Sequence, residues 1–219
     1  MKKIKLTLLL LLTSACIHAQ TRGSGKLIER SYPYKGFDKV AIEDLDGRVE
    51  IEIGKVWSIS VVIDDNLFPL LAFEENPTEY QLKIAFRGNR DNKMYIEDTN
   101  VLIKITMPEA SVIKNNSNAV IVVNNAIGGY LRLENLDNGA IKASGKVDLL
   151  DVSCSGNGTI SAGELMVKTA EIKGSGNGNI LVNVDQKIIA KISGNGSVKN
   201  IGKAKYAANS KRTGNGNLL

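Results

Sequence analysis

The chain has 219 residues, a formal charge of +5, two cysteines, a single histidine and only 5% aromatic residues. The histidine, His18, lies in an N-terminal segment that we expect to be removed, which excludes a Ser-His-Asp triad, a Cys-His pair and a His-ligated zinc site from the rest. Cys16 lies in the same segment, so Cys154 would remain alone without an internal disulfide, and we expect it to be a small buried thiol. We therefore expect no metal and no cofactor.

Residues 1–19 are typical of a secretory signal peptide. Three lysines at positions 2, 3 and 5 precede the apolar run "LTLLLLLT", which is too short to cross a bilayer, and "IHA" provides a cleavage site before Gln20. Loss of these three lysines lowers the formal charge from +5 to about +2. A second interpretation is a lipobox, "TSAC", that would leave a lipid anchor at Cys16. Either cleavage predicts an exported protein in the periplasm, at the outer membrane or on the extracellular surface.

The next segments are irregular. Residues 20–32 are expected to be a flexible lead, and residues 33–219 a single domain. Within that domain, residues 33–115 alternate apolar and polar side chains in "VEIEI", "EYQLKIAF" and "VLIKITMP", which predicts strands, while "NLFPLLAFEEN" could hold a short helix. We expect residues 33–115 to form wide, decorated coils at one end of the domain.

The regular part, residues 116–219, contains six copies of one short unit, best seen in "SGNGTI" and "GSGNGNI". Each copy has an asparagine followed three places later by an aliphatic residue. Successive asparagines are 20, 19, 20, 18 and 20 residues apart, and near-constant periods of this length are typical of a solenoid. The asparagines are Asn118, Asn138, Asn157, Asn177, Asn195 and Asn215, and the aliphatic residues are Ile121, Ile141, Ile160, Ile180, Val198 and Leu218.

A parallel β-helix of about 19 residues per coil explains this pattern, because like positions of successive coils then stack roughly 4.8 Å apart. Stacked asparagines can hydrogen-bond to one another at a structural corner, and the neighbouring glycines allow a tight turn and a close approach of the coils. The aliphatic residue would turn inward and form a core column. An alternative interpretation takes Asn-Gly as a hairpin turn, which predicts an antiparallel prism or sandwich.

The order of these segments carries a resemblance. "FDKVAIEDLDGRVEIEIG", "ISVVIDDNLFPLLAFEENPTEYQLKI", "VLIKITMPEASVI" and the serial "SGNG" units resemble the secreted Bacteroidetes family called putative auto-transporter adhesin, head GIN domain. The resemblance covers nearly all of the chain after the signal peptide. It implies an all-β, right-handed parallel β-helix outside the inner membrane, and it supplies no catalytic motif.

Glycine-rich units can also bind ligands, but these units lack the features that would be needed. A phosphate loop ends in Lys-Ser or Lys-Thr before a helix, and a calcium repeat has an aspartate in each unit. Paired carboxylates could support glycoside hydrolysis, and neighbouring coils could bring Asp151 near Glu171, 20 residues later. The acidic residues otherwise occupy non-equivalent positions, so we expect no catalytic site and no enzyme.

Charge is unevenly distributed along the chain. From Gln186 to the end there is no acidic residue, which predicts a basic patch for an anionic partner such as lipopolysaccharide or an acidic glycan. Two other interpretations are head-to-tail self-association through the solenoid ends and lysines that protect an open sheet edge. Nucleic acid is not expected, since Tyr206 is the only aromatic residue there. The basic residues are Lys187, Lys191, Lys199, Lys203, Lys205, Lys211 and Arg212.

Together these features favour an exported, non-enzymatic β-helix that acts as an adhesin or as a module that binds carbohydrate or a cell surface. Repetition provides an extended rigid face and no ready-made pocket. The alternatives are a polysaccharide-active enzyme with carboxylates on one face and a purely structural component of the cell envelope.

Overall fold

The structure, a computed structural model, describes residues 21–88 and 96–219. The predicted signal peptide, with Cys16 and His18, lies outside these residues. The described chain is all-β apart from one 3-10 turn, η1 (Phe68–Leu70), within the segment expected to hold a short helix. Its strands are β1 (Thr21–Arg22), β2 (Leu27–Tyr32), β3 (Lys39–Glu43), β4 (Arg48–Ile53), β5 (Ser58–Asp64), β6 (Leu71–Asn76), β7 (Gln81–Phe86), β8 (Ile96–Glu97), β9 (Leu102–Met107), β10 (Val112–Asn116), β11 (Val120–Asn135), β12 (Ala140–Cys154), β13 (Thr159–Gly174), β14 (Ile180–Ser193), β15 (Val198–Asn200) and β16 (Lys211–Thr213).

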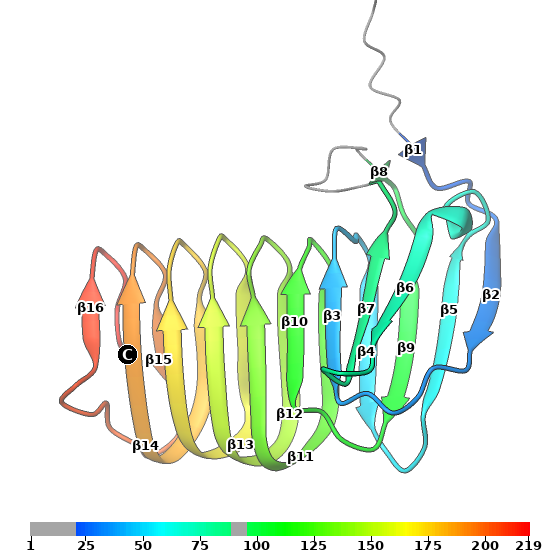
Figure 1. Ribbon diagram of the computed structural model, residues 1–219. Coiled ribbons are helices and arrows are strands. Elements are labelled where there is room, and N and C mark those ends of the chain that lie inside the picture. The colour runs from blue at the N-terminus through cyan, green and yellow to red at the C-terminus, as the bar shows by residue number, and fades with distance from the viewer. Residues whose placement is uncertain (1–20, 89–95) are drawn as a thin grey trace, which may run out of the picture.

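Strands β11 to β14 are the longest elements, at 14 to 16 residues each. Each one bends at the lower edge of the molecule, so that its first half lies in one face and its second half in the opposite face (Figure 1). We call the face of β3, β7, β10, β16 and the second halves the front face. The back face contains β4, β9, β15 and the first halves. These strands are longer than the usual length of about five residues because each one contributes to both faces.

All pairs within the regular part are parallel, as the sequence predicts for residues 116–219. Ile121 pairs with Ile141, Ile141 with Ile160, and Ile160 with Ile180. The same column continues into the first part of the domain, where Val49 pairs with both Ile121 and Ile103. Like residues therefore lie above like residues from β9 to β15.

Residues 33–115 share these columns but add antiparallel pairs. Strand β3 is parallel to β7 and β10, and β4 is parallel to β9. In contrast, β5 is antiparallel to β9 and β6 to β7, and β2, which precedes this range, is antiparallel to β5. The additional strands are thus antiparallel, and they lie at the end opposite the C-terminus (Figure 1).

The expected flexible lead is also corrected by the structure. Leu27–Tyr32 forms β2 along the whole of β5, and Thr21–Arg22 pairs with Ile96–Glu97. Alternation within β2 is weak, since only Ile28 and Tyr32 are half-buried, and this explains why sequence reasoning missed the strand. Its ladder of backbone hydrogen bonds closes the outer edge of β5, which would otherwise be open.

The core is a continuous row of aliphatic side chains between the two faces. Strand β7 shows the alternation that produces it, with Leu82, Ile84 and Phe86 buried and the residues between them partly exposed. Near the N-terminal end of the described chain, Phe73 packs against Tyr32 in a tilted arrangement and against Tyr34 in a stacked one, with ring centroids 4.2 and 5.3 Å apart. Small aliphatic residues suffice elsewhere because each coil repeats the shape of the one before it.

Candidate functional site

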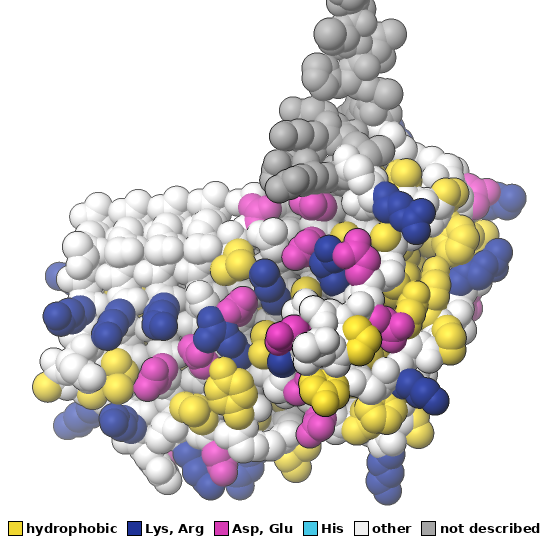
Figure 2. Space-filling view, in the orientation of Figure 1, with side chains coloured by type: hydrophobic (Ala, Val, Ile, Leu, Met, Phe, Trp, Pro, Cys, Tyr) yellow, Lys and Arg dark blue, Asp and Glu magenta, His cyan; other side chains and the backbone are white. Residues whose placement is uncertain are grey.

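The six asparagines of the repeat form a hydrogen-bonded ladder along the upper edge. Each side-chain amide donates to the carbonyl oxygen of the preceding asparagine, over N···O distances of 3.4, 2.9, 2.8, 2.8 and 3.1 Å from Asn138 to Asn215. Figure 2 shows this edge as neutral white ridges without charged side chains. The ladder is solvent-exposed, and its bonds hold the side-chain amides in a fixed row, so it is a structural corner.

Glycine is required beside the ladder because successive coils touch there. A Cβ on Gly196 would overlap the carbonyl oxygen of Gly178, and one on Gly178 would overlap that of Gly158. No side chain fits between these backbones. The corner is therefore packed too closely to admit a phosphate or a metal ion.

A second column of residues lies just inside the corner, at the end of the strand that precedes each turn. Asn115 and Asn135 are fully buried, and their amides donate to the carbonyl oxygens of Ala119 and Gly139. Cys154 occupies the equivalent position, with its sulfur 3.4 Å from a carbonyl oxygen four residues later. Burial raises the pKa of this thiol to about 11. Cys154 is thus a buried structural thiol, as the sequence predicts, and its proton is held too tightly for a nucleophile.

The aliphatic residues of the repeat face the interior. Ile121, Ile141, Ile160, Ile180 and Val198 are each at most 2% exposed. Leu218 is only partly buried because it belongs to the last coil, where it forms an isolated parallel bridge with Val198. At ~25 cal/mol per Å², each fully buried isoleucine stabilises the fold by roughly 1.5–3 kcal/mol.

The residues of the predicted basic patch lie on different strands and loops and do not form one surface. Lys191 and Lys211 pair in register on the front face, and Lys173 joins them as the next residue of the same column. Figure 2 shows a row of basic side chains at this end of the front face. Lys199 pairs with Leu181 on the back face instead. Lys187 lies in β14 at the register position of Thr169, and Lys203 and Lys205 lie between β15 and β16.

The guanidinium of Arg212 is held in place by two neutral acceptors of the last coil. Its guanidinium donates to the carbonyl oxygen of Gly216 at 3.1 Å and to the side-chain oxygen of Asn217 at 3.0 Å. The first of these bonds repeats, in the last coil, the bond that Asn135 makes to a carbonyl four residues later. Sequence reasoning grouped Arg212 with the lysines because position in a coil is not visible in a charge count.

The suggested carboxylate pair lies on the front face. Asp151 and Glu171 are register neighbours, as their spacing predicts. The guanidinium of Arg132 bonds both Asp151 and Glu134, the latter at 2.5 Å. The hydrogen bond to Glu134, followed by the charge of Asp151, raises the pKa of Arg132. Asp151 is thus held in an ion-pair network, which is unsuited to the proton donor of a glycosidase.

The back face carries a groove that the sequence did not reveal. Two adjoining cavities of about 330 and 320 Å³ share Ser161 and Leu181, and together they cross the first halves of β11 to β14 and reach β15. Ile201 and Leu219, 52% and 63% exposed, are also among the lining residues. Ser161 lies in register between Lys142 and Leu181, so the short serine leaves a hollow between two longer side chains. We call it the back-face groove; its other outward-facing lining residues include Val122, Lys142, Ser144, Thr159, Ser197 and Lys199.

Two other polar clusters are balanced internally. In a cavity of about 590 Å³ near β6 and β7, Lys83 lies 2.5 Å from Glu74 and 3.8 Å from Glu43. The hydrogen bond to Glu74 is the main reason that the pKa of Lys83 is raised. This cluster joins β3, β6 and β7, and its ammonium group already contacts both carboxylates.

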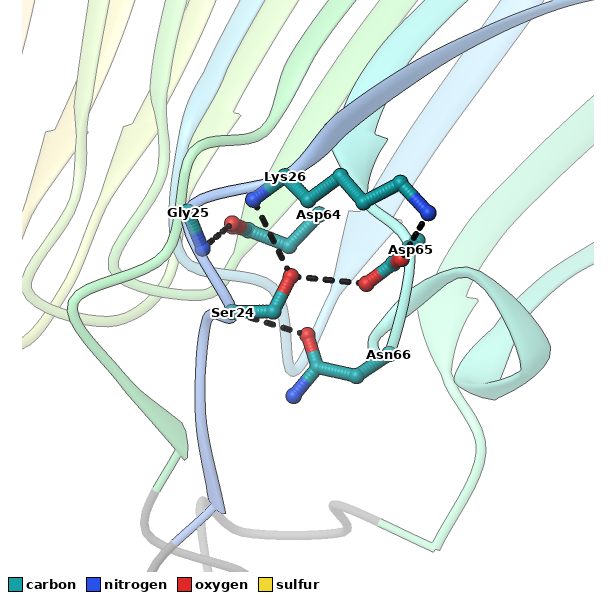
Figure 3. A network of polar contacts seen from close by, with 6 residues as sticks. All are labelled: Ser24, Gly25, Lys26, Asp64, Asp65 and Asn66. Carbon is teal, nitrogen blue, oxygen red and sulfur yellow. Dashed lines mark hydrogen bonds and ion pairs between the residues drawn. The ribbon is translucent and has the colours of Figure 1, made fainter.

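The second cluster anchors the N-terminal strand (Figure 3). Asp64 is fully buried, and its two carboxylate oxygens accept the backbone N–H groups of Gly25 and Asn100, each at 2.8 Å. Ser24 donates its hydroxyl to Asp65 at 2.7 Å. Since the oxygens of Asp64 are occupied by backbone donors, the cluster fixes the start of β2. No group of His, Cys, Asp and Glu residues in the described ranges could hold a metal ion.

The comparisons with known proteins agree with this architecture. The chain belongs to the family described as putative auto-transporter adhesin, head GIN domain, whose model matches residues 36–204. The resemblance drawn from the sequence is thereby confirmed. No match was found among curated proteins.

Several solved structures are similar to this chain in fold. A putative adhesin from Bacteroides fragilis has a TM-score of 0.67 and 18% identity, covering 90% of this chain and 97% of its own. A putative adhesin from Parabacteroides merdae has a TM-score of 0.56 and 16% identity over 91% and 99%. A putative lipid binding protein from Parabacteroides distasonis has a TM-score of 0.50 and 19% identity over 91% and 100%. At these identities the likeness shows the fold alone.

Proposed function

We propose that this protein is an exported, non-enzymatic adhesin that binds carbohydrate or another surface ligand through the back-face groove. Its scaffold in this proposal is a right-handed parallel β-helix with about 19 residues per coil in residues 116–219. Membership of the adhesin family and the long rigid face support it. In the part of the chain that the structure describes, no helix has the length and hydropathy to cross a bilayer.

The back-face groove is the observation that carries the proposal. Its lining combines serine and threonine hydroxyls, which donate and accept hydrogen bonds, with the aliphatic side chains of Val122, Leu181 and Ile201. An extended chain of sugar rings offers both hydroxyls and apolar C–H surfaces at a regular spacing. A groove that crosses several stacked coils can hold such a ligand along its length.

The proposal is tested by retention on immobilised neutral and acidic glycans. We expect binding without release of shortened products. Ser161→Trp places a large ring where the two cavities meet and should weaken retention roughly tenfold or more. Ser153→Trp is the matched control, since Ser153 is a half-buried serine on the front face. Product release would favour a polysaccharide-active enzyme, and retention that Ser161→Trp leaves unchanged would rule out the groove.

A second candidate is recognition of an anionic surface by the front-face lysines. Lys173, Lys191 and Lys211 are in register about 4.8 Å apart, as strand spacing requires, and none has an acidic partner among the described residues. Three adjacent ammonium groups repel one another unless a polyanion neutralises them. Lys191→Glu should abolish retention on acidic glycans and leave neutral glycans unaffected. Equal loss on both would contradict this candidate.

Export and assembly are separate parts of the proposal. Mass analysis of the secreted N-terminus distinguishes cleavage before Gln20 from a lipidated Cys16, and thus a free periplasmic or extracellular protein from an anchored one. Sedimentation across a range of concentrations tests self-association through the ends of the solenoid. Self-association without retention of any ligand would favour a structural component of the envelope.

A further inference from the structure

A cavity of about 390 Å³ lies outside the repeat, at the edge opposite the asparagine ladder. It forms where β3, β5 and β7 begin and where β9 ends, which is the lower edge in Figure 1. Segments far apart in sequence thus contribute one side chain or loop each. The lining residues are Gly36, Phe37, Asp38, Trp57, Tyr80 and Glu109.

Two large aromatic side chains of this cavity remain exposed to solvent. Trp57 is 41% exposed and Tyr80 is 61% exposed, although Phe37 beside them is buried. The indole N–H of Trp57 donates to the carbonyl oxygen of Phe37 at 3.4 Å, so the polar edge of the ring is directed at the protein. Exposed aromatic rings at the mouth of a cavity are typical of ligand sites.

The backbone holds Tyr80 in an unusual conformation. Its φ of 53° lies in the left-handed region, which is unfavourable for a tyrosine. Its carbonyl oxygen accepts the N–H groups of both Asp38 and Lys39, at 3.0 and 3.1 Å. These two bonds fix Tyr80 beside Asp38, and residues held in such conformations concentrate at functional sites.

The charged residues of the cavity are all acidic. Asp38 and Glu109 line it, and none of the lining residues is basic. One carboxylate oxygen of Asp38, Oδ1, is buried and has no hydrogen-bond partner in the structure. A buried carboxylate oxygen without a donor is costly, and a positive charge held nearby in the cavity would lower that cost by Coulomb attraction.

We propose that this cavity binds a small organic cation whose charge is carried by an alkylated nitrogen, of the choline type. The faces of tryptophan and tyrosine attract such a cation, and its methyl groups match their apolar surface. Asp38 and Glu109 balance its charge at short range. A neutral sugar would use the rings, but the lining side chains offer it acceptors and almost no donors.

This inference is independent of the proposed adhesive function. The back-face groove is lined by residues of β11 to β15 and the segments that follow them, whereas every residue of this cavity precedes β10. Loss of one site should leave the other intact. Retention on glycans by a variant that no longer binds choline would separate the two.

The sequence provides its own reporter, because Trp57 is the only tryptophan. Choline added to the full chain at constant ionic strength should change tryptophan fluorescence in a saturable manner. The matched ligand is 3,3-dimethylbutan-1-ol, which has nearly the same shape without the charge, and it should bind roughly tenfold more weakly or worse. Equal affinities would overturn the proposal, as would saturation by methyl glucoside but not by choline.

Variants test the assigned groups. Asp38→Asn removes the charge at nearly constant shape, and Tyr80→Asn removes the ring while tolerating the left-handed backbone. Each should weaken choline binding roughly tenfold or more. Tyr130→Asn is the control, since Tyr130 is an exposed tyrosine of β11 outside the cavity, and unchanged thermal unfolding shows that each variant is folded. Binding unaffected by both cavity variants would overturn the assignment.

Discussion

Residues 33–115 and 116–219 use the same core columns but complete their coils differently. In the regular part, a Gly-Asn-Gly corner, an inward aliphatic residue and a long bent strand recur in parallel register. In the first part the corresponding corner is Asp46-Gly47-Arg48 and the strands are short. Strands β5 and β6 are antiparallel additions there, and β2, which precedes this part, is a third.

The comparison shows that stacking repeated coils and forming a compact site place different demands on the side chains. Repetition requires each residue to fit its own copy above and below, so the regular part excludes bulky corners and contains only Tyr130 and Tyr206 as aromatic residues. The first part has all four phenylalanines and the tryptophan. Without the constraint of repetition, its loops can bring Trp57, Tyr80 and Asp38 together in a cavity. Repeated surfaces suit extended ligands, and irregular ends suit compact ones.

The largest expected effect comes from a charge in the repeated core. Ile180→Asp places an unpaired carboxylate in a position that is 2% exposed, between Ile160 and Val198. We expect a loss of more than about 4 kcal/mol of unfolding free energy, enough to prevent folding. Far-ultraviolet circular dichroism and urea unfolding measure it. The control is Leu181→Asp, whose side chain points outward; equal damage would contradict the inward column.

The second prediction compares two glycines from the two regions. Gly196→Ala would force a Cβ onto the carbonyl oxygen of Gly178, so we expect a loss of roughly 2–4 kcal/mol. Gly36→Ala meets no atom within 4 Å and has only its φ of +80° against it, which costs about 1–2 kcal/mol. Urea unfolding of both variants checks the order. If Gly36→Ala were the more harmful, close contact of the coils would not be the reason for the repeated glycines.

The third prediction concerns pH. Burial raises the pKa of Cys154 from 9.0 to about 11, so the folded state retains a proton that the unfolded chain loses between these values. Stability is therefore unaffected below about pH 8 and declines as the pH rises from 9 to 11, by on the order of 1 kcal/mol at pH 10. Urea unfolding at pH 8 and pH 10 measures the decline. Cys154→Ala should lack this component, and an identical decline in both proteins would refute it.

The smallest expected effect comes from the asparagine ladder. Asn177→Ala removes two hydrogen bonds, to Asn157 and from Asn195, each 2.8 Å long. Because the ladder is exposed, we expect a loss of about 1 kcal/mol. Asn215→Ala removes only one ladder bond, at the end of the row, and should cost about half as much. Thermal unfolding compares the two, and equal losses would mean that the ladder does not act through pairwise bonds.

More of the structure of the regular part than of the rest could be predicted from the sequence. The period of 18 to 20 residues predicts which residues share a column, because parallel strands in register place equivalent residues side by side. The family, the all-β class and the buried Cys154 were also accessible from local pattern. Antiparallel β2 was missed because its alternation is weak and its partner, β5, begins 26 residues after β2 ends.

The candidate sites could not be predicted from the sequence, because the fold decides which side chains meet. The lysines near the C-terminus are neighbours in sequence, yet the bends of the coils separate Lys199 from Lys191 and align Lys191 with Lys173 and Lys211. The residues of the cavity around Trp57 and Tyr80 come from four segments of the chain. No repeat in the sequence indicates that these segments lie together.

By itself, the sequence determined the repeated column and its corner, because in a parallel stack each side chain meets its own equivalent and the period alone sets the partner. Only the tertiary structure decided which faces are hollow and which charges meet, since these depend on where each coil bends and on how the antiparallel strands cover its end.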